Sequence, residues 1–161
     1  DYKGGIIFYI DDTKAHGLIA AKEDIGYGEM DPNKIIFPWG LYEKTYIIDN
    51  ADGIINTGDI IKAINNPAIS DQTAAGQCAR YKPSNDPAVF QEGWYLPSLQ
   101  EFQHVIDANP AIGMYKDAYW LSTADIKDNK YALRVEYNFN ISKFGNGLRD
   151  QKARVRAIHK F

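Results

Sequence analysis

The chain has 161 residues, 45% of them apolar, and a formal net charge of −3 that comes from 21 acidic and 18 basic side chains mixed along the sequence. Domains commonly run to roughly 100–200 residues, so we expect residues 1–161 to form a single domain. The mixed charges give no strong electric field, which disfavours nucleic acid and anionic lipid as partners.

The single cysteine, Cys78, excludes an intrachain disulfide, a zinc cluster built on thiolates and a redox pair. No apolar run approaches the roughly 18–20 residues that span a bilayer, so we expect no membrane insertion. We also expect that any signal or anchor was removed or never present, because no basic and apolar leader stands at Asp1. These observations do not decide in which cellular compartment the protein acts.

The first forty residues predict a β-hairpin followed by an irregular loop. Gly4–Ile10 is β-branched and aromatic, Asp11–Gly17 has the composition of a turn, and Leu18–Glu23 forms the returning strand. Glycines and prolines then interrupt Asp24–Trp39, which we expect to be a loop that ends with the indole of Trp39 buried.

Two short helices are expected next. Thr57 caps a helix over Gly58–Asn66, which Pro67 ends, and Ser70 caps a second helix over about Asp71–Tyr81. The second helix carries small and apolar residues at helical spacing, and this pattern predicts a buried and inert thiol rather than a nucleophile. These residues are Ala74, Ala75, Cys78 and Tyr81.

The stretch "EGWYLPSLQEF", Glu92 to Phe102, predicts a corner between a strand and a helix. Pro97 holds the residue before it in an extended conformation. Ser98 and Glu101 then form a capping box, which satisfies backbone N–H groups at the start of a helix. We therefore expect the residues of this stretch to shape the fold rather than to form a binding or catalytic site.

The C-terminal third predicts antiparallel strands. Ala118–Thr123 has the composition of a strand, and Tyr131–Asn140 alternates apolar residues from Tyr131 to Phe139 against polar ones, which predicts one core face and one exposed face. Phe144–Asp150 is a glycine-rich turn, and Ala153–Phe161 forms the last strand. A hairpin, then helices, then antiparallel strands make an α+β domain.

Motifs for metal binding and catalysis are weak. His16, His104 and His159 lie far apart and outside any ligand spacing. Asp49–Gly53 fails as a calcium loop, because its first ligand position would be Ile48. No serine-hydrolase or phosphate-loop motif occurs, and we expect no cofactor.

Two features of composition leave alternatives open. The eleven tyrosines, with many asparagines and glycines, suit either a recognition surface or an ordinary β-rich core. Basic residues gather in the C-terminal third, where they form either a solvated strand face or a patch for acidic sugars and anionic partners. They are Lys143, Arg149, Lys152, Arg154 and Arg156.

Five segments in chain order carry a family resemblance: "GGIIFYIDDTKAHGLIAA", "WG", "GWYLPSLQEF", "YWLSTA" and "RVRAIHKF". Together they resemble the bacterial family of the Legionella collagen-like protein C-terminal domain. The resemblance implies a C-type lectin-like fold, in which the first and last strands pair and two helices flank a twisted antiparallel core. The resemblance extends to a related group, the variable proteins of diversity-generating retroelements, which display changeable side chains on the C-terminal strands of this fold.

Members of these groups act as adhesins, pilus tips or phage receptor-binding proteins. The resemblance therefore implies a noncatalytic domain at a bacterial surface or on a phage particle, which binds a glycan or a surface protein, as a homotrimer or within a larger protein. The matching framework positions are Trp94, Leu96, Pro97, Trp120 and Val155. The implied ligand-binding positions are Asp128, Lys130, Arg134, Glu136, Asn138, Asn140, Lys143, Asn146, Arg149 and Gln151.

The chain also departs from the family pattern. Lys22–Pro38 is longer than the corresponding loop, so we expect it to extend the binding rim. The triplets of calcium-dependent lectins are absent, and the single Cys78 argues against the enzyme branch that makes formylglycine with a cysteine pair. Two alternatives remain: a structural module for a fibre tip or oligomer, and an enzyme such as a glycosidase, which needs a concave pocket with two facing carboxylates.

Overall fold

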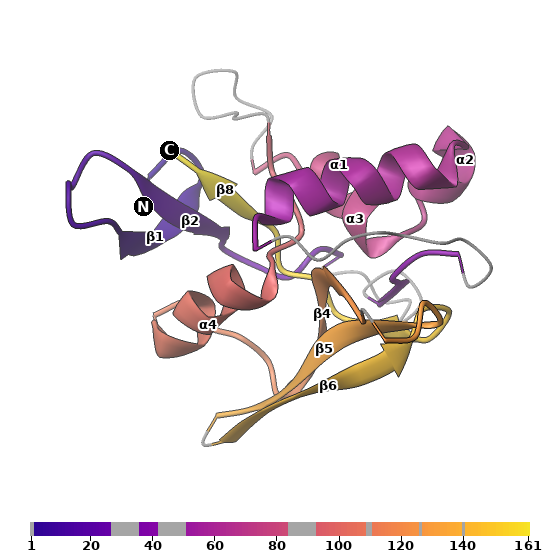
Figure 1. Ribbon diagram of the computed structural model, residues 1–161. Helices are drawn as coiled ribbons and strands as arrows, with labels where there is room; N and C mark the ends of the chain where they lie inside the picture. Colours follow the sequence, from indigo (N-terminus) through magenta and orange to yellow (C-terminus); the bar gives the residue numbers. More distant parts are fainter. Residues whose placement is uncertain are drawn as a thin grey trace.

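The computed structural model describes residues 2–26, 36–41, 51–83, 93–108, 111–125, 127–139 and 141–161. This part of the chain is an α+β structure with antiparallel sheets and short helices (Figure 1). The helices are α1 (Gly53–Ile64), α2 (Pro67–Ser70), α3 (Ala74–Ala79) and α4 (Leu99–Asp107). The strands are β1 (Gly5–Ile10), β2 (Gly17–Ala21), β3 (Phe37–Pro38), β4 (Asp117–Ala124), β5 (Tyr131–Asn138), β6 (Ile141–Leu148), β7 (Lys152–Ala153) and β8 (Ile158–Lys160).

The N-terminal hairpin forms as the sequence predicts, and the C-terminal strand joins it in a sheet of order β1-β2-β8. The resemblance implies that the first and last strands pair, and the structure corrects this, because β8 pairs with the second strand. Every residue of β2 is buried, as expected of a strand with neighbours on both edges. By contrast, β1 lies at the edge and exposes Ile7 and Ile10 at 39% and 51%.

The first helix is longer than the sequence predicts, because a different residue caps it. α1 begins at Gly53 behind Asp52, whose side chain accepts a hydrogen bond from the Ile54 backbone N–H. Thr57, expected to be the cap, lies within the helix. Its hydroxyl instead accepts a hydrogen bond from the Leu96 backbone N–H at 3.0 Å, and so links α1 to the corner before α4.

The second predicted helix also starts later than expected. α3 begins behind Thr73 rather than Ser70, with the Thr73 hydroxyl accepting from the Gly76 backbone N–H at 3.3 Å. The apolar stripe is confirmed for Ala74, Ala75 and Cys78, which are all fully buried. Its fourth member, Tyr81, lies beyond the end of α3 at Ala79 and is half-buried. Burial raises the pKa of the Cys78 thiol well above its ordinary value.

The capping box at the start of α4 is confirmed. The Ser98 hydroxyl accepts a hydrogen bond from the Glu101 backbone N–H at 3.3 Å, and the Glu101 carboxylate accepts one from the Ser98 backbone N–H at 2.9 Å. Phe102 and Val105 are fully buried one and two turns along the helix. The described part of the "EGWYLPSLQEF" stretch, from Gly93, is thus a corner that leads into α4, as its local chemistry predicts. The predicted strand before the corner is reduced to a single β-bridge between Tyr95 and Ile158.

Strand β6 occupies the segment where the sequence predicts a glycine-rich turn, and that prediction is wrong. Phe144–Leu148 pairs with β5 in continuous register. A Cβ at Gly147 would lie 2.7 Å from the ring of Trp120 and 3.0 Å from Cδ of Arg134. Glycine at this position therefore leaves space for the ring of Trp120, which belongs to β4, and it does not mark a turn.

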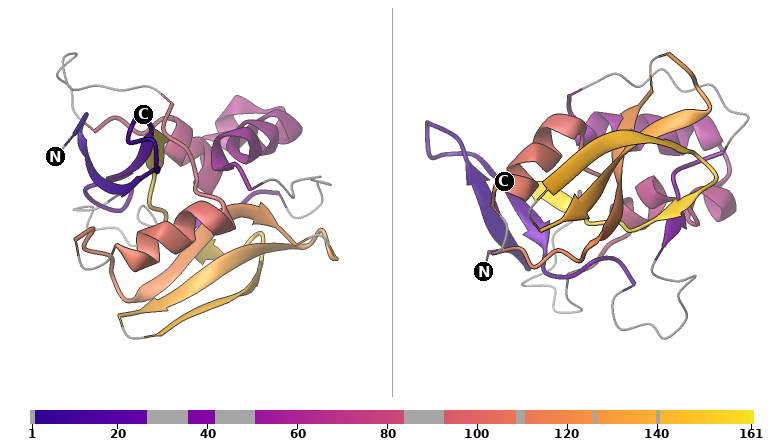
Figure 2. Two further views of the ribbon diagram at one scale, coloured as in Figure 1. Left: turned by 60° about the vertical axis from the view of Figure 1, so that its left-hand side comes forward. Right: turned by 90° about the horizontal axis from the view of Figure 1, so that it is seen from below.

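The β4-β5-β6 sheet has one covered face and one half-covered face. Helix α4 lies over the first face (Figures 1 and 2), where Phe102 and Val105 pack with Tyr119 and Val135. The second face is covered at the end that carries Trp120, which packs in one core cluster with residues of α1, α3 and the β3 segment. The other end of the second face carries the exposed side chains of Glu136, Asn138 and Lys143, and we call it the open end of the sheet.

The alternation of β5 holds only in part. Ala132, expected on the exposed face, is fully buried, because it lies opposite Gly147 and Ala124 on the face that Trp120 fills. Phe139, expected in the core, is 63% exposed just beyond the end of the strand. One end of the sheet is buried on both faces by packing against distant elements, and the alternation of residues along a strand cannot predict this.

The predicted last strand, Ala153–Phe161, divides into β7 and β8. Between these strands, Arg154 and Arg156 direct their side chains toward Asp24. Within the described ranges, no helix combines the length and the apolar character that crossing a bilayer requires.

Candidate functional site

The open end of the β4-β5-β6 sheet brings together several of the predicted binding residues. Strand register places Glu136 between Ala118 of β4 and Lys143 of β6. Side chains alternate along a strand, so Arg134 and Asn138 share the face of Glu136. Glu136, Asn138 and Lys143 are exposed, and Arg134 is partly buried.

A hollow of about 510 Å³ lies on this face. The small side chain of Ala118 lies beside the longer side chain of Glu136 on the paired strand β5, and this difference in length contributes to the concave surface. The hollow is lined by Lys116, Asp117, Ala118, Glu136, Tyr137, Asn138 and Lys143. We refer to it below as the sheet hollow.

One carboxylate of the sheet hollow is held by an arginine. Arg134 donates to Glu136 Oε1 at 3.2 Å and to Gln151 Oε1 at 3.4 Å, and Gln151 Oε1 also accepts from the Leu148 backbone N–H at 3.2 Å. The Glu136 side chain is 63% exposed. Exposed ion pairs contribute little to stability, so the effect of this pair is to orient and neutralise Glu136.

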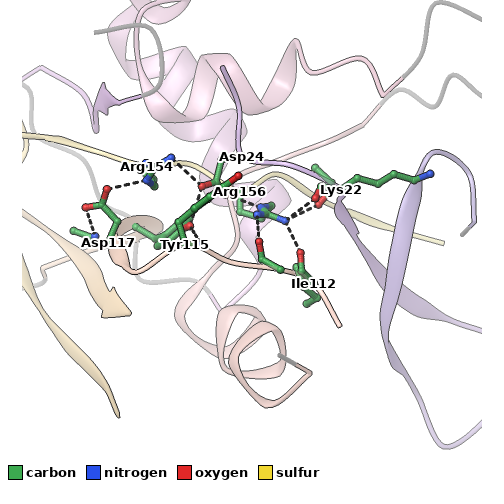
Figure 3. A network of polar contacts seen from close by, with 11 residues as sticks. Lys22, Asp24, Ile112, Tyr115, Asp117, Arg154 and Arg156 are labelled. Carbon is green, nitrogen blue, oxygen red and sulfur yellow. Dashed lines mark hydrogen bonds and ion pairs between the residues drawn. The ribbon is translucent and has the colours of Figure 1, made fainter. Parts of the chain in front are cut away.

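The other carboxylate of the sheet hollow connects to the core, as Figure 3 shows. Arg154 Nε donates to Asp117 Oδ2 at 2.8 Å, and a second guanidinium nitrogen lies 3.4 Å from Asp24 Oδ2. The same guanidinium lies over the ring of Tyr115, 4.8 Å from its centre. These contacts fix Arg154, and Arg154 in turn fixes Asp117 at the rim.

Asp24 is the centre of a buried polar network (Figure 3). It is 3% exposed, and it accepts from Arg156 Nε at 2.7 Å and from the Tyr119 hydroxyl at 2.8 Å. Burial and the Asp24 charge raise the pKa of Tyr119 well above its ordinary value, so the phenol stays protonated. The fully buried Arg156 also donates to the backbone carbonyls of Ala21, Lys22, Ile112 and Gly113.

Arg149 does not belong to the exposed face, and this prediction is corrected. It is fully buried, its Nε donates to the Tyr131 carbonyl at 3.2 Å, and its guanidinium lies 4.7 Å from the ring centre of Trp39. The two alternatives for the basic C-terminal third, a solvated face and an anion-binding patch, therefore do not apply to Arg149 or Arg156. Their long side chains serve packing and backbone hydrogen bonds.

Three other predicted positions lie away from the sheet hollow. Asn146 alternates to the opposite face of β6 and forms a hydrogen bond with the Asp125 side chain. Asp128 and Lys130 belong to the turn before β5, where the Asp128 carboxylate accepts from the Lys130 backbone N–H at 2.9 Å. The ten predicted positions thus do not form one contiguous surface.

Some predictions fall outside the described residues. Asn140 is one of them, and residues 27–35, the greater part of the predicted rim loop Lys22–Pro38, are others. Their contribution to binding stays a prediction.

Four of the seven residues that line the sheet hollow were not among the predicted binding positions: Lys116, Asp117, Ala118 and Tyr137. No motif marks them, and the two charged ones stand where β4 begins, with Lys116 directly before its first residue, Asp117. One signal was present: Lys116 continues backwards the alternation of Trp120 and Ala118, which places it on the face of the hollow.

A second hollow, of about 540 Å³, lies between the N-terminal hairpin and α4, and its lining includes three carboxylates, those of Asp11, Asp52 and Glu101. The Asp11 carboxylate accepts a hydrogen bond from the Thr13 hydroxyl at 2.7 Å. Glu101 accepts hydrogen bonds from the backbone N–H groups of Ser98 and Gly53 and from the Tyr95 hydroxyl. Asp52 caps α1 and lies 2.6 Å from Lys160 Nζ. The protein's own donors therefore engage all three carboxylates, and Asp52 and Glu101 join the N-termini of α1 and α4.

No three His, Cys, Asp or Glu side chains within the described ranges are grouped so as to hold a metal ion. Comparison of the sequence with models of known protein families gives no match, and no curated protein matches it either.

Proposed function

We propose that this domain is a noncatalytic ligand-binding module, an adhesin or receptor-binding domain, which recognises carbohydrate or protein ligands through the open face of its β4-β5-β6 sheet. One observation carries the proposal. The sheet hollow is lined by Glu136, Asn138 and Lys143, which are positions that the family resemblance independently assigns to ligand display. Concave surfaces with a few convergent polar groups are the usual sites for small ligands.

The proposal includes a C-type lectin-like fold and membership of the family that the sequence resembles, with a place at a bacterial surface or on a phage particle. Two features support it. The N-terminal hairpin pairs with the C-terminal strand, and α1 and α4 flank the antiparallel strands (Figure 1).

The chemistry of the face suits a ligand rich in hydroxyl groups. Asn138 offers an amide that both donates and accepts hydrogen bonds, and Glu136 offers acceptors. In this proposal these groups bind and orient a ligand and carry out no reaction on it.

The test is binding of the purified domain to a glycan array and to candidate surface proteins, with a triple variant, Glu136→Ala, Asn138→Ala and Lys143→Ala. We expect binding to weaken by about tenfold or more, since truncation of central contact residues commonly costs over about 1 kcal/mol each. A control variant, Asp59→Ala with Lys62→Ala, changes two exposed charges on α1 that do not line the hollow, and it should bind normally. Undiminished binding of the triple variant, with an unchanged circular dichroism spectrum, would show that this face is not the site.

The structural alternative, a fibre-tip or oligomerisation module, has one observation in its favour. β1 is an edge strand with Ile7 and Ile10 exposed, and such edges can pair with a second chain. Light scattering separates the two functions. A stable oligomer in which a variant with Ile7→Lys and Ile10→Lys becomes monomeric would favour the structural module, whereas a ligand-binding monomer would favour our proposal.

A further inference from the structure

The hollow between the N-terminal hairpin and α4, about 540 Å³ in volume, is built from segments that lie far apart in the chain. The hairpin, the residues that lead into α1, the first half of α4 and residues 160–161 all contribute to its lining. It shares no lining residue with the sheet hollow, so it is a separate place on the molecule. We refer to it below as the hairpin hollow.

Aromatic rings form fixed walls of the hairpin hollow. The rings of Tyr9 and His104 stack with their centres 4.1 Å apart and their planes at 26°, which ties β1 to α4. Phe161 exchanges two backbone hydrogen bonds with Gly17, at 3.0 and 3.1 Å, and a Cβ at Gly17 would lie only 2.6 Å from its Cζ atom. The faces of such rings attract cations, and a guanidinium group also stacks on them because it is flat.

The charged side chains of the hairpin hollow leave negative charge in excess. Its lining carries three carboxylates but a single ammonium group, that of Lys160. Lys160 Nζ lies 2.6 Å from Asp52 Oδ2 and 3.7 Å from Glu101 Oε1, so its positive charge is already matched by these two carboxylates. Electrostatic complementarity therefore favours a cation as the ligand of this hollow.

Asp11 is the lining carboxylate whose charge no cation balances. Its hydrogen bonds come from uncharged donors, the Thr13 hydroxyl at 2.7 Å and the His16 backbone N–H at 3.5 Å. Among the residues that the structure describes, no lysine or arginine forms an ion pair with it. The hydrogen bond from Thr13 lowers the pKa of Asp11, so the carboxylate keeps its charge at neutral pH. The turn thus holds a negative charge in place at the edge of the aromatic walls.

We infer that the hairpin hollow is a second binding site, which takes an organic cation with a guanidinium group. The flat group would stack on the fixed rings of Phe161 or of the Tyr9 and His104 pair and donate to Asp11, because its paired N–H groups fit a carboxylate. Leu18 offers apolar surface for the methylene chain that carries the group. The same chemistry is found in an arginine side chain of a partner protein and in a small free guanidine.

The test is titration of the isotope-labelled intact chain with three probes, followed by NMR of the histidine rings. The probes are a blocked peptide with one arginine, the same peptide with citrulline, which is neutral and of equal shape, and agmatine, a small guanidine. We expect the arginine peptide to bind at least fivefold more tightly than the citrulline peptide, as for an ion pair open to solvent, and its affinity to fall as salt rises. Agmatine identifies the source: binding as tight as that of the peptide indicates a free small cation, and weaker binding indicates a partner protein.

The three histidines report where the probe binds. His16 and His104 line the hairpin hollow, so their ring signals should shift as the arginine peptide is added. The ring of His159 lies outside the hollow, with its centre 5.6 Å from that of the Trp94 ring, and its signals should stay unchanged as an internal reference.

The variant Asp11→Asn removes the charge and keeps an oxygen for the Thr13 hydroxyl. It should lower the affinity for the arginine peptide by about three- to fivefold. Asp12→Asn is the matched control, because it makes the same charge change at an exposed neighbour that does not line the hollow, and it should leave the affinity unchanged.

Three results would overturn the inference: equal affinity for the arginine and citrulline peptides, shifts that spare His16 and His104, or equal affinities of the Asp11→Asn and Asp12→Asn variants. The peptide comparison uses the unaltered chain, so it decides the question even if Asp11→Asn disturbs the turn. None of these results bears on ligand binding at the sheet hollow, which the triple variant of the open face tests on its own.

Discussion

Replacement of Asp24 by asparagine tests the buried network that holds the C-terminal segment against the loop after β2. The variant keeps the size of the side chain and an oxygen that can accept from the Tyr119 hydroxyl. It removes the negative charge 2.7 Å from the guanidinium of Arg156, a side chain with no exposure to solvent. The positive charge of Arg156 then stays buried without its counter-charge.

The magnitude follows from the geometry of the pair. Breaking a buried ion pair by removing one partner commonly costs about 3–5 kcal/mol. Arg156 keeps its hydrogen bonds to backbone carbonyls, so we place the cost at the lower end, about 3 kcal/mol. At about 2–4 °C per kcal/mol for a protein of this size, the melting temperature should fall by about 6–12 °C.

Urea denaturation followed by circular dichroism measures the free energy of unfolding. Asp117→Asn is the matched control, since Asp117 contacts the same arginine system from a side chain that is 46% exposed, and it should cost less than about 1 kcal/mol. The reasoning is refuted if Asp24→Asn costs less than about 1 kcal/mol, or if the two variants lose the same stability.

Three further predictions concern packing and ionisation. Gly147→Ala should lower the free energy of unfolding in urea by about 1–3 kcal/mol, because the added methyl group meets the Trp120 ring. Gly145→Ala on the same strand is the control, since its methyl group meets no atom within 4 Å. Equal losses of stability in the two variants would contradict this prediction. Cys78 should resist alkylation at pH 8 in the native state, because burial raises the pKa of its thiol, and labelling faster than global unfolding would be the contrary result. Burial lowers the pKa of His159, so the protein should lose stability as the pH falls below about 6.5, where the unfolded chain takes up the proton first. His159→Gln should reduce the change of melting temperature with pH between pH 7 and pH 5. An unchanged pH dependence would exclude His159 as its source.

The parts of this fold that the sequence predicts are those decided by neighbouring residues. The capping box of Ser98 and Glu101 involves atoms three residues apart, and it appears in the structure as expected. The N-terminal hairpin and strand β4 follow from local composition in the same way. Helix caps were less predictable, since Asp52 and Thr57 are both suitable caps and only the contact of Thr57 with Leu96 assigns it to the helix interior.

The candidate site was predictable only where alternation along one strand suffices. Glu136 and Asn138 share a face because side chains alternate along β5. Lys143 lies beside them because β5 pairs with β6. Predicting that pairing would have required recognising a strand in a segment rich in glycine. Lys116 directly precedes β4, and only the structure shows that it lines the hollow.

The sequence by itself determined the α+β class, the hairpin, the corner before α4 and the polar face of β5, because each depends on contacts within a few residues. Only the tertiary structure decided that Gly147 lies under Trp120, that Arg149 and Arg156 are buried, and that Lys116 meets Lys143 in one hollow. The physical reason is that the burial of a charge and the register of a strand depend on residues far away in the chain. Arg156 and its counter-charge Asp24 lie 132 positions apart, and no local pattern contains such a pair.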